Sequence, residues 1–101
     1  MVTTVYQVVW TRRSQLQMRL VFDYISKDSA KNAQKVLQDI VIAVGKAANN
    51  PELYPPDKWK ENNDGSYRAF EKHRFRISYR FTNNIIRVLR VRHVSMEPKS
   101  Y

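Results

Sequence analysis

The 101-residue sequence contains no cysteine, which excludes disulfides, thiolate zinc sites and cysteine nucleophiles. Its two glycines, Gly45 and Gly65, are too few for a phosphate-binding loop or a dinucleotide-binding fold. Two histidines are too few for a histidine-rich metal cluster, so no metal or cofactor is expected. No apolar run approaches the roughly 20 residues that span a bilayer, and the first residues do not resemble a signal peptide. We therefore expect a cytoplasmic protein without a membrane partner.

Acidic residues are scarce, since 18 lysines and arginines stand against nine acids and give a net charge of +9. The excess is concentrated in residues 66–93, which hold eight basic groups and one acid. This imbalance favours a polyanionic partner such as RNA, DNA, a ribosome or an acidic protein. A basic surface can equally be only solvated, so charge alone leaves these readings open.

The hydrophobic pattern predicts one α+β domain over residues 1–101, with the order β-α-α-β-β-β and a helical hairpin on one face of a mainly antiparallel four-stranded sheet. The predicted strands are residues 4–11, 66–72, 75–81 and 85–93. The predicted helices are residues 14–26, with Ser14 and Gln17 as a capping box, and residues 30–49, capped by Asp28 or Ser29. Both faces of the first strand are apolar, which is typical of a strand inside a sheet rather than at its edge.

Residues 51–65 hold three of the four prolines and the segment Asn62-Asn63-Asp64-Gly65. We interpret them as a loop anchored by Leu53, Tyr54 and Trp59, and a loop of this length in a compact domain is often functional. Hairpin turns are predicted at Lys72-His73-Arg74, where His73 is a surface residue, and at Thr82-Asn83-Asn84, since asparagine tolerates positive φ. The tail from Val94, which contains Pro98, either drapes over the sheet or is mobile.

The strand over residues 75–81 alternates strictly between apolar and polar side chains. Phe75, Ile77, Tyr79 and Phe81 share one face, so Arg76 and Arg80 must share the other. If the helices cover the apolar face, these arginines form a cationic floor on the opposite one, and Arg68, Arg90 and Arg92 join it if the register allows. A planar guanidinium suits a phosphate because it can engage two oxygens at once.

Metal-free RNA cleavage needs a proton acceptor, a proton donor and cations near the phosphorane. Arg76 is the best placed phosphate clamp, His93 is a candidate acid or base, and Tyr101 is a second proton-transfer group or a stacking platform. Each has a structural alternative, because His93 can be a hydrogen-bonding surface residue and Tyr101 a frayed end. Lys58 and Lys60, which flank Trp59, are either RNA contacts or solvated.

Three segments carry a family resemblance: Tyr67-Arg68-Ala69-Phe70, then residues 75–81, then Ile86-Arg87-Val88-Leu89-Arg90-Val91-Arg92-His93. Together with the predicted helical hairpin and the proline-containing loop, their order resembles the RelE/ParE toxin superfamily of bacterial type II toxin–antitoxin systems. The resemblance implies a toxin that is blocked by an acidic or amphipathic antitoxin. One branch of the superfamily cleaves mRNA on the ribosome without a metal, and the other poisons DNA gyrase and has no known nuclease centre.

Three residues match the nuclease branch. Arg76 stands at its Arg-x-x-Tyr position, His93 matches the C-terminal histidine of YoeB-like nucleases, and Tyr101 resembles the tyrosine of the RelE tail. Our sequence-based hypothesis is ribosome-dependent mRNA cleavage by these three residues. The expected contacts to the RNA backbone are Arg68, Arg80, Arg92, Lys58 and Lys60. The alternatives are a toxin that binds and poisons gyrase, and a degenerate member that only engages its antitoxin.

Overall fold

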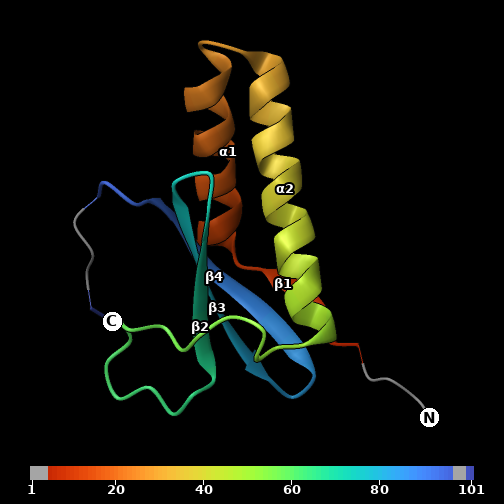
Figure 1. The fold of residues 1–101 in the computed structure, drawn as a ribbon, viewed down its shortest axis with the longest axis vertical. Helices are drawn as coiled ribbons and strands as arrows, with labels where there is room; N and C mark the ends of the chain where they lie inside the picture. The colour runs from red at the N-terminus through yellow and green to blue at the C-terminus, as the bar shows by residue number, and fades with distance from the viewer. Residues whose placement is uncertain (1–4, 97–99) are drawn as a thin grey trace.

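The structure, a computed structural model, describes residues 5–96 and 100–101. It contains β1 (Gln7–Trp10), α1 (Arg12–Ser26), α2 (Ala30–Asn49), β2 (Tyr67–Lys72), β3 (Phe75–Thr82) and β4 (Ile85–His93). The two helices form an antiparallel hairpin whose connecting turn extends beyond the sheet (Figure 1). The strands form one sheet in the order β1-β4-β3-β2. The predicted α+β fold is therefore confirmed, with helices on one face of a sheet that is antiparallel except for the β1–β4 pair.

The core lies between α2 and the sheet. Alanine, valine and isoleucine recur on α2 at steps of three and four residues, and this spacing places them on one face. The most deeply buried of them are Ala33, Val36, Ile40, Val44 and Ala47. They pack against alternate residues of β3 and β4, among them Ile77, Tyr79, Ile86 and Val88, each of which has no exposed surface. This apolar layer fixes which side of each strand faces the helices.

Helix α1 begins earlier than predicted. Its N-cap is Thr11, whose side-chain oxygen accepts the backbone N–H of Ser14 at 3.1 Å. Ser14 lies inside the helix, where its hydroxyl donates to the Thr11 carbonyl, and Gln17 accepts the N–H of Val91 at 2.6 Å. The prediction of a capping box at Ser14 and Gln17 was therefore wrong. The chain leaves β1 in the extended conformation at Thr11, and threonine is itself a favoured N-cap residue. The cap of α2 at Ser29 is confirmed.

Strand β1 is an edge strand, so the prediction of an interior strand was wrong. The part of it that was expected at Thr4 lies outside the described residues. The apolar side chains of one face have partners even at the edge, since Tyr6, Val8 and Trp10 pack against the core cluster. Val9, on the other face, pairs in register with Arg87. At four residues the strand is short, which limits the row of unpaired backbone groups that an edge exposes.

The loop over residues 51–65 is held against the sheet at several points. Tyr54 stacks on Phe70 with ring centroids 4.3 Å apart, and its hydroxyl donates to the Ala43 carbonyl. Pro56 pairs with Arg68 across the outer edge of β2, as a short isolated bridge. Tyr54 is thus an anchor as predicted, whereas Leu53 is 48% exposed and is not.

Both predicted hairpin turns are confirmed. Asn83 and Asn84 have φ values of 49° and 62°, the left-handed conformation that asparagine tolerates. His73 and Arg74 adopt the same conformation, and His73 is exposed at the surface. The Nε2 atom of His73 lies 2.6 Å from a carboxylate oxygen of Asp39, which connects this turn to α2.

Candidate functional site

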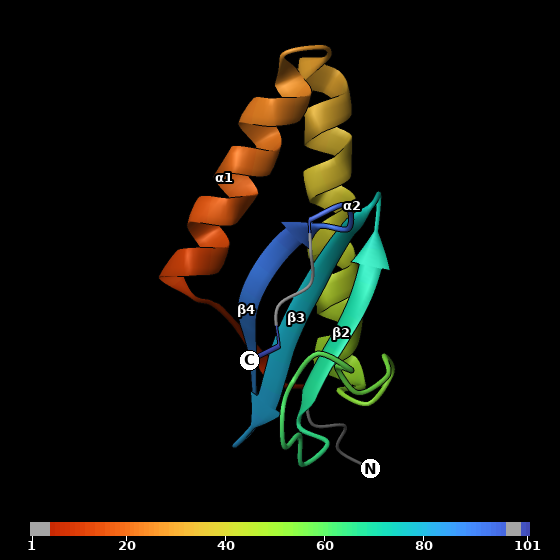
Figure 2. The same ribbon diagram turned by 90° about the vertical axis from the view of Figure 1, so that its left-hand side faces the viewer.

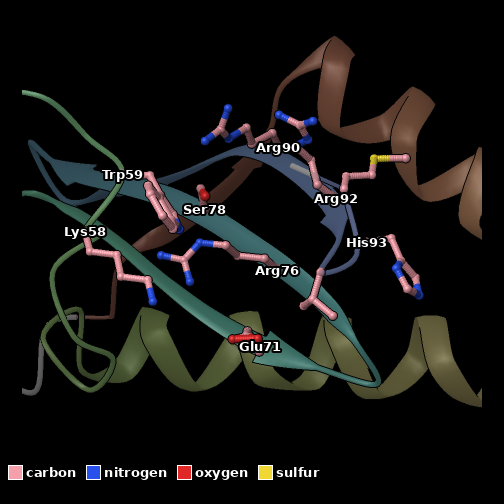
Figure 3. A pocket seen from close by; sticks show the side chains of 10 residues that line it. Lys58, Trp59, Glu71, Arg76, Ser78, Arg90, Arg92 and His93 are labelled. Carbon is pink, nitrogen blue, oxygen red and sulfur yellow. The ribbon is translucent and has the colours of Figure 1, made fainter. Parts of the chain in front are cut away.

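Five arginines share the sheet face that the helices leave open. Arg76 and Arg80 of β3 point away from the buried Ile77 and Tyr79. Arg80 pairs with Arg87 of β4, and Arg76 pairs with Arg92. We call the set Arg76, Arg80, Arg87, Arg90 and Arg92 the arginine face; Figure 3 shows three of its members around a cavity.

A bulge makes this arrangement possible. Tyr79 pairs with Val88 and Ser78 pairs with Arg90, so Leu89 is the extra residue in β4. In a regular strand Arg87 and Arg90, three positions apart, would lie on opposite faces. The additional residue restores them to the same face. It also allows Val88 and Val91 both to remain in the core.

Arg76 is tied to the loop by an ion pair. Its Nη2 atom donates to the Oδ1 atom of Asp57 at 2.7 Å, and the Asp57 residue is only 2% exposed. The backbone N–H of Trp59 donates to the same oxygen at 3.0 Å. Burial by itself raises the pKa of Asp57, but the hydrogen bonds from Tyr101, Arg76 and Trp59 outweigh it, so the net pKa lies below the usual value. At neutral pH the pair is therefore fully charged.

Tyr101 lies on the same face and completes the cluster. Its hydroxyl donates to the second Asp57 oxygen at 2.6 Å. Its ring centroid is 4.1 Å from the guanidinium carbon of Arg90 and 5.4 Å from the Lys60 ammonium. Figure 2 shows the end of the chain in front of the sheet, with α2 behind it. The tail therefore drapes over the sheet at Tyr101, while Pro98 lies outside the described residues.

The environment of Tyr101 keeps its hydroxyl protonated. Burial raises the pKa of this phenol, and the hydrogen bond and negative charge of Asp57 raise it further. A phenol whose pKa is raised is a weak acid, and here its proton is already committed to Asp57. Tyr101 is consequently suited to holding Asp57 and presenting its ring, and poorly suited to releasing a proton near neutral pH.

A cavity of about 180 Å³ opens between the loop and the arginine face (Figure 3). Its lining includes Lys58, Trp59, Arg76, Arg90 and Arg92. The only acid in the described lining is Glu71, at the rim on β2. The cavity is therefore cationic, with an indole beside the charges, and chemically it can hold an anionic group.

His93 is not assembled with Arg76. It pairs in register with Phe75, and the two rings meet edge to face at 5.2 Å. Since Phe75 and Arg76 are consecutive residues of a strand, the side chains of Arg76 and His93 lie on opposite faces of the sheet. His93 borders the cavity only at the end of β4, and its Nδ1 atom accepts the backbone N–H of Ser95 at 3.0 Å. The structure thus brings Arg76 and Tyr101 together and leaves His93 apart.

Arg68 does not join the arginine face, so that expectation was wrong. It pairs in register with the buried Tyr79 and lies on the helix side of the sheet. Its guanidinium donates to the carbonyls of Gly65 and Tyr54 at 2.8 and 3.1 Å. The register of β2 against β3 decides this placement, and the alternation within β2 alone does not reveal it. Arg68 holds the ends of the loop.

The other predicted backbone contacts are on or near the open face. Arg80 lies 4.7 Å from the Tyr67 ring and donates to the Ser66 hydroxyl. Lys58 is exposed above Trp59, and Lys60 lies 4.7 Å from the Tyr67 ring. Arg92 lines the cavity. Cations and aromatic rings therefore alternate across this surface.

Sequence reasoning missed two residues of the site. Asp57 follows Pro55-Pro56 in the loop, and no spacing rule connects it with Arg76, which is 19 positions away. Arg87 was missed because simple alternation places it opposite Arg90. A signal for Arg87 was present, since the core positions Val88 and Val91 have an odd spacing that indicates a bulge.

Metal-ligand clusters and membrane-spanning helices are both absent from the part of the chain that the structure describes. Residues 5–96 and 100–101 contain no cluster of three or more histidine or acidic residues able to hold a metal ion. Within the same ranges, neither helix combines the length and the apolar character needed to cross a membrane.

The fold is that of proteins solved as parts of toxin–antitoxin systems. The chain belongs to the ParE toxin family of type II toxin–antitoxin systems, parDE, whose family model matches residues 8–98. It is therefore a toxin of a type II toxin–antitoxin system, and the superfamily resemblance seen in the sequence is confirmed.

Two solved structures share the fold. One is described as the chromosomal ParDE toxin–antitoxin system from P. aeruginosa, with a TM-score of 0.71 and 20% identity over 91% of this chain and 99% of that chain. The other is the toxin–antitoxin complex RelBE2 from Mycobacterium tuberculosis, with a TM-score of 0.60 and 18% identity over 88% of this chain and 98% of that chain. No curated protein matches the sequence.

Proposed function

We propose that this toxin stops growth by binding and poisoning DNA gyrase, without cleaving RNA. The observation that carries the proposal is the placement of the His93 ring against Phe75, at the end of β4, whereas Arg76 points to the open face. A general acid or base must come within about 2.6–3.2 Å of the proton it transfers. The His93 ring is held instead by Phe75 and Ser95, at the edge of the cavity.

The contacts of Arg76 and Tyr101, the other two candidate catalytic residues, also favour a toxin that does not cleave RNA. The Arg76 guanidinium is engaged by the buried Asp57 carboxylate, which offsets its charge. The Tyr101 hydroxyl donates to that carboxylate and its pKa is raised. The match to the ParE family model also supports gyrase as the target, because we take ParE toxins to be the branch of the superfamily that poisons gyrase.

Two measurements test the target. Purified toxin added to gyrase and relaxed plasmid is expected to inhibit supercoiling and to leave cleaved DNA–gyrase complexes. In cells that express the toxin without its antitoxin, mRNA is expected to remain intact when mapped by primer extension. Unaffected gyrase together with cut mRNA would overturn the proposal and establish the RNA-cleaving alternative.

That alternative has one observation in its favour, which is the gathering of Arg76, Arg90 and Tyr101 on one face. A histidine pair separates the two functions. His93→Ala is expected to retain full toxicity if gyrase is the target, and to lose it if His93 transfers a proton. His73→Ala is the matched control, because His73 is exposed at a hairpin turn and does not line the cavity.

We also propose that the partner is an acidic, amphipathic antitoxin segment that binds between α1 and β4. A groove of about 750 Å³ lies there, lined by Leu20, Val21 and Tyr24 of α1 and bordered by Arg13 and Arg92. Leu20 and Tyr24 are 66% and 68% exposed, an unusual exposure for large apolar side chains one turn apart. An apolar groove with a cationic border fits a helix with one apolar and one acidic face.

Co-expression with the product of the neighbouring gene tests this partner. Leu20→Glu is expected to lose the complex and to remain toxic. Val41→Glu is the control, since Val41 is a comparably exposed apolar residue on α2 and does not line the groove. Equal binding by both variants would place the antitoxin elsewhere.

A further inference from the structure

Tyr101 occupies the open face as a bound side chain. Its backbone N–H donates to the Trp59 carbonyl at 3.0 Å, and its carbonyl accepts the N–H of Glu61 at 2.7 Å. Its hydroxyl reaches Asp57, its ring lies against Arg90, and the Tyr67 ring meets it edge to face at 6.1 Å. Backbone, ring and hydroxyl are therefore all engaged at the same time.

The groups that hold Tyr101 are those that a polyanion would use. Arg90 is among the five arginines of the arginine face, and its guanidinium plane is covered by the Tyr101 ring. Lys60 also lies toward this ring. The hydroxyl binds the Asp57 carboxylate, which keeps the partner of Arg76 in place. While Tyr101 is bound, the central part of the arginine face is consequently occupied.

We propose that the arginine face is a binding site for single-stranded nucleic acid and that Tyr101 is its intramolecular competitor. The ligand takes the place of the tyrosine, so the site is available only after Tyr101 has left. The proposal goes beyond the poisoning of gyrase, because a toxin that acts on a protein target does not require a nucleic-acid site on this face.

The chemistry of the face selects a single strand over an acidic peptide. Cations alternate with aromatic rings across it: Lys58 lies over Trp59, and Arg80 and Lys60 lie over Tyr67. Phosphates bind the guanidinium and ammonium groups, while unpaired bases stack on the rings, which is the usual composition of single-strand sites. An acidic peptide would use the charges and leave the rings unused.

Competition by Tyr101 lowers the apparent affinity for the nucleic acid. This apparent affinity equals the intrinsic affinity of the open face multiplied by the fraction of molecules in which the face is open. A face that is open in about one tenth of the molecules would bind roughly tenfold more tightly once the competitor is removed. The test is fluorescence anisotropy with labelled 12-nucleotide oligothymidine DNA and oligouridine RNA. Tyr101→Ala is expected to bind about tenfold more tightly than the wild type. Leu16→Ala, which shortens an exposed side chain of α1 that lines neither the cavity nor the groove, is expected to bind as the wild type does.

Several results would overturn the inference. Weaker binding by Tyr101→Ala would make Tyr101 part of the ligand site, and unchanged binding would mean that it does not compete. Tyr101→Phe keeps the ring and removes only the hydroxyl, so it is expected to lie between the wild type and the alanine variant. Equal competition by poly-glutamate and by oligonucleotide would overturn the choice of ligand.

A second set of measurements locates the ligand. In the Tyr101→Ala background, Arg80→Ala is expected to weaken binding and to reduce the slope of log affinity against log salt by about 1. Arg19→Ala, an exposed arginine on α1, is the control and should change neither quantity. In the wild type, saturating oligonucleotide should accelerate hydrogen exchange at the Glu61 amide, whose acceptor is the Tyr101 carbonyl. Continued protection of that amide in the complex would contradict displacement.

Discussion

The two faces of the sheet are built from alternate residues of the same strands, yet different forces determine them. On the helix side, Ile77 and Tyr79 have no exposed surface and pack against α2. On the open side, Arg76 and Arg80 are only partly buried and are held by ion pairs, hydrogen bonds and aromatic rings. Packing therefore stabilises one face, while the other presents charged groups that polar and aromatic contacts hold in place.

The comparison teaches where substitutions should affect folding and where they should affect binding. Burial of apolar surface contributes far more free energy than partly exposed charge–charge contacts. The buried Asp57 is the exception on the open side, because its carboxylate is enclosed by donors from β3, the loop and the tail. The three predictions below test this division, beginning with the largest effect.

The largest loss of stability is expected from shortening a side chain on the helix face. Ile77→Ala should lower the free energy of unfolding by about 2–5 kcal/mol, because it leaves a cavity in a closely packed core. Arg80→Ala, three positions along the same strand, should lower it by no more than about 1 kcal/mol. Urea denaturation followed by circular dichroism measures both. Equal losses of unfolding free energy in the two variants would contradict the inference that packing stabilises the helix face far more than charge stabilises the open face.

A smaller loss is expected at Asp57. Asp57→Asn removes the charge that faces Arg76 and should lower the free energy of unfolding by up to about 3 kcal/mol. The pKa of Asp57 is lowered in the folded protein, so its contribution to stability is present above the unfolded pKa of about 3.9 and is lost as pH falls through the folded pKa.

The pH series provides the control for this prediction. The difference in unfolding free energy between the wild type and Asp57→Asn should be constant near neutrality and should shrink as the pH falls below about 4. Urea midpoints measured between pH 7 and pH 2 would show it. A difference that does not change with pH would mean that the asparagine acts through packing and that the carboxylate charge contributes nothing.

The smallest loss of stability is expected at Arg68, the arginine that lies on the helix side of the sheet. Arg68→Ala removes two hydrogen bonds to loop carbonyls and should destabilise the fold by about 1–2 kcal/mol. Arg87→Ala, at an exposed position of the arginine face, should change stability by less than about 0.5 kcal/mol. For oligonucleotide binding we expect the reverse order, with Arg87→Ala weakening binding more than Arg68→Ala. Weaker nucleic-acid binding by Arg68→Ala at unchanged stability would contradict its placement on the helix side.

Much of the fold could be predicted from the sequence because periodicity is a local property. The alternation in residues 75–81 and the three-and-four spacing along α2 each depend on a single element, and both are confirmed. The edge position of β1 could not be predicted in this way. Apolar residues on both faces are compatible with an interior strand and also with an edge strand of which only one face packs against the core.

The candidate site was less predictable because it depends on relations between elements. Arg76 is on the open face as expected, and Tyr101 lies close to it. The register between β2 and β3 places Arg68 on the other side, and pairing with Phe75 places His93 there as well. Asp57 joins the site through a loop conformation that no pattern in the sequence encodes.

The extra residue in β4 has a consequence for how this protein tolerates change. Removing Leu89 would leave Val88 and Arg90 consecutive, opposite Tyr79 and Ser78, so the strand would alternate regularly and the segments on both sides of the deletion would keep their present faces. Arg90 and Arg92 would still point to the open face, and Ile86 and Val88 would still point to the core. A one-codon deletion should consequently be better tolerated at this position than at the paired positions of β4, where it would turn over one segment of the strand, and alignments of related sequences should be allowed to place a gap there.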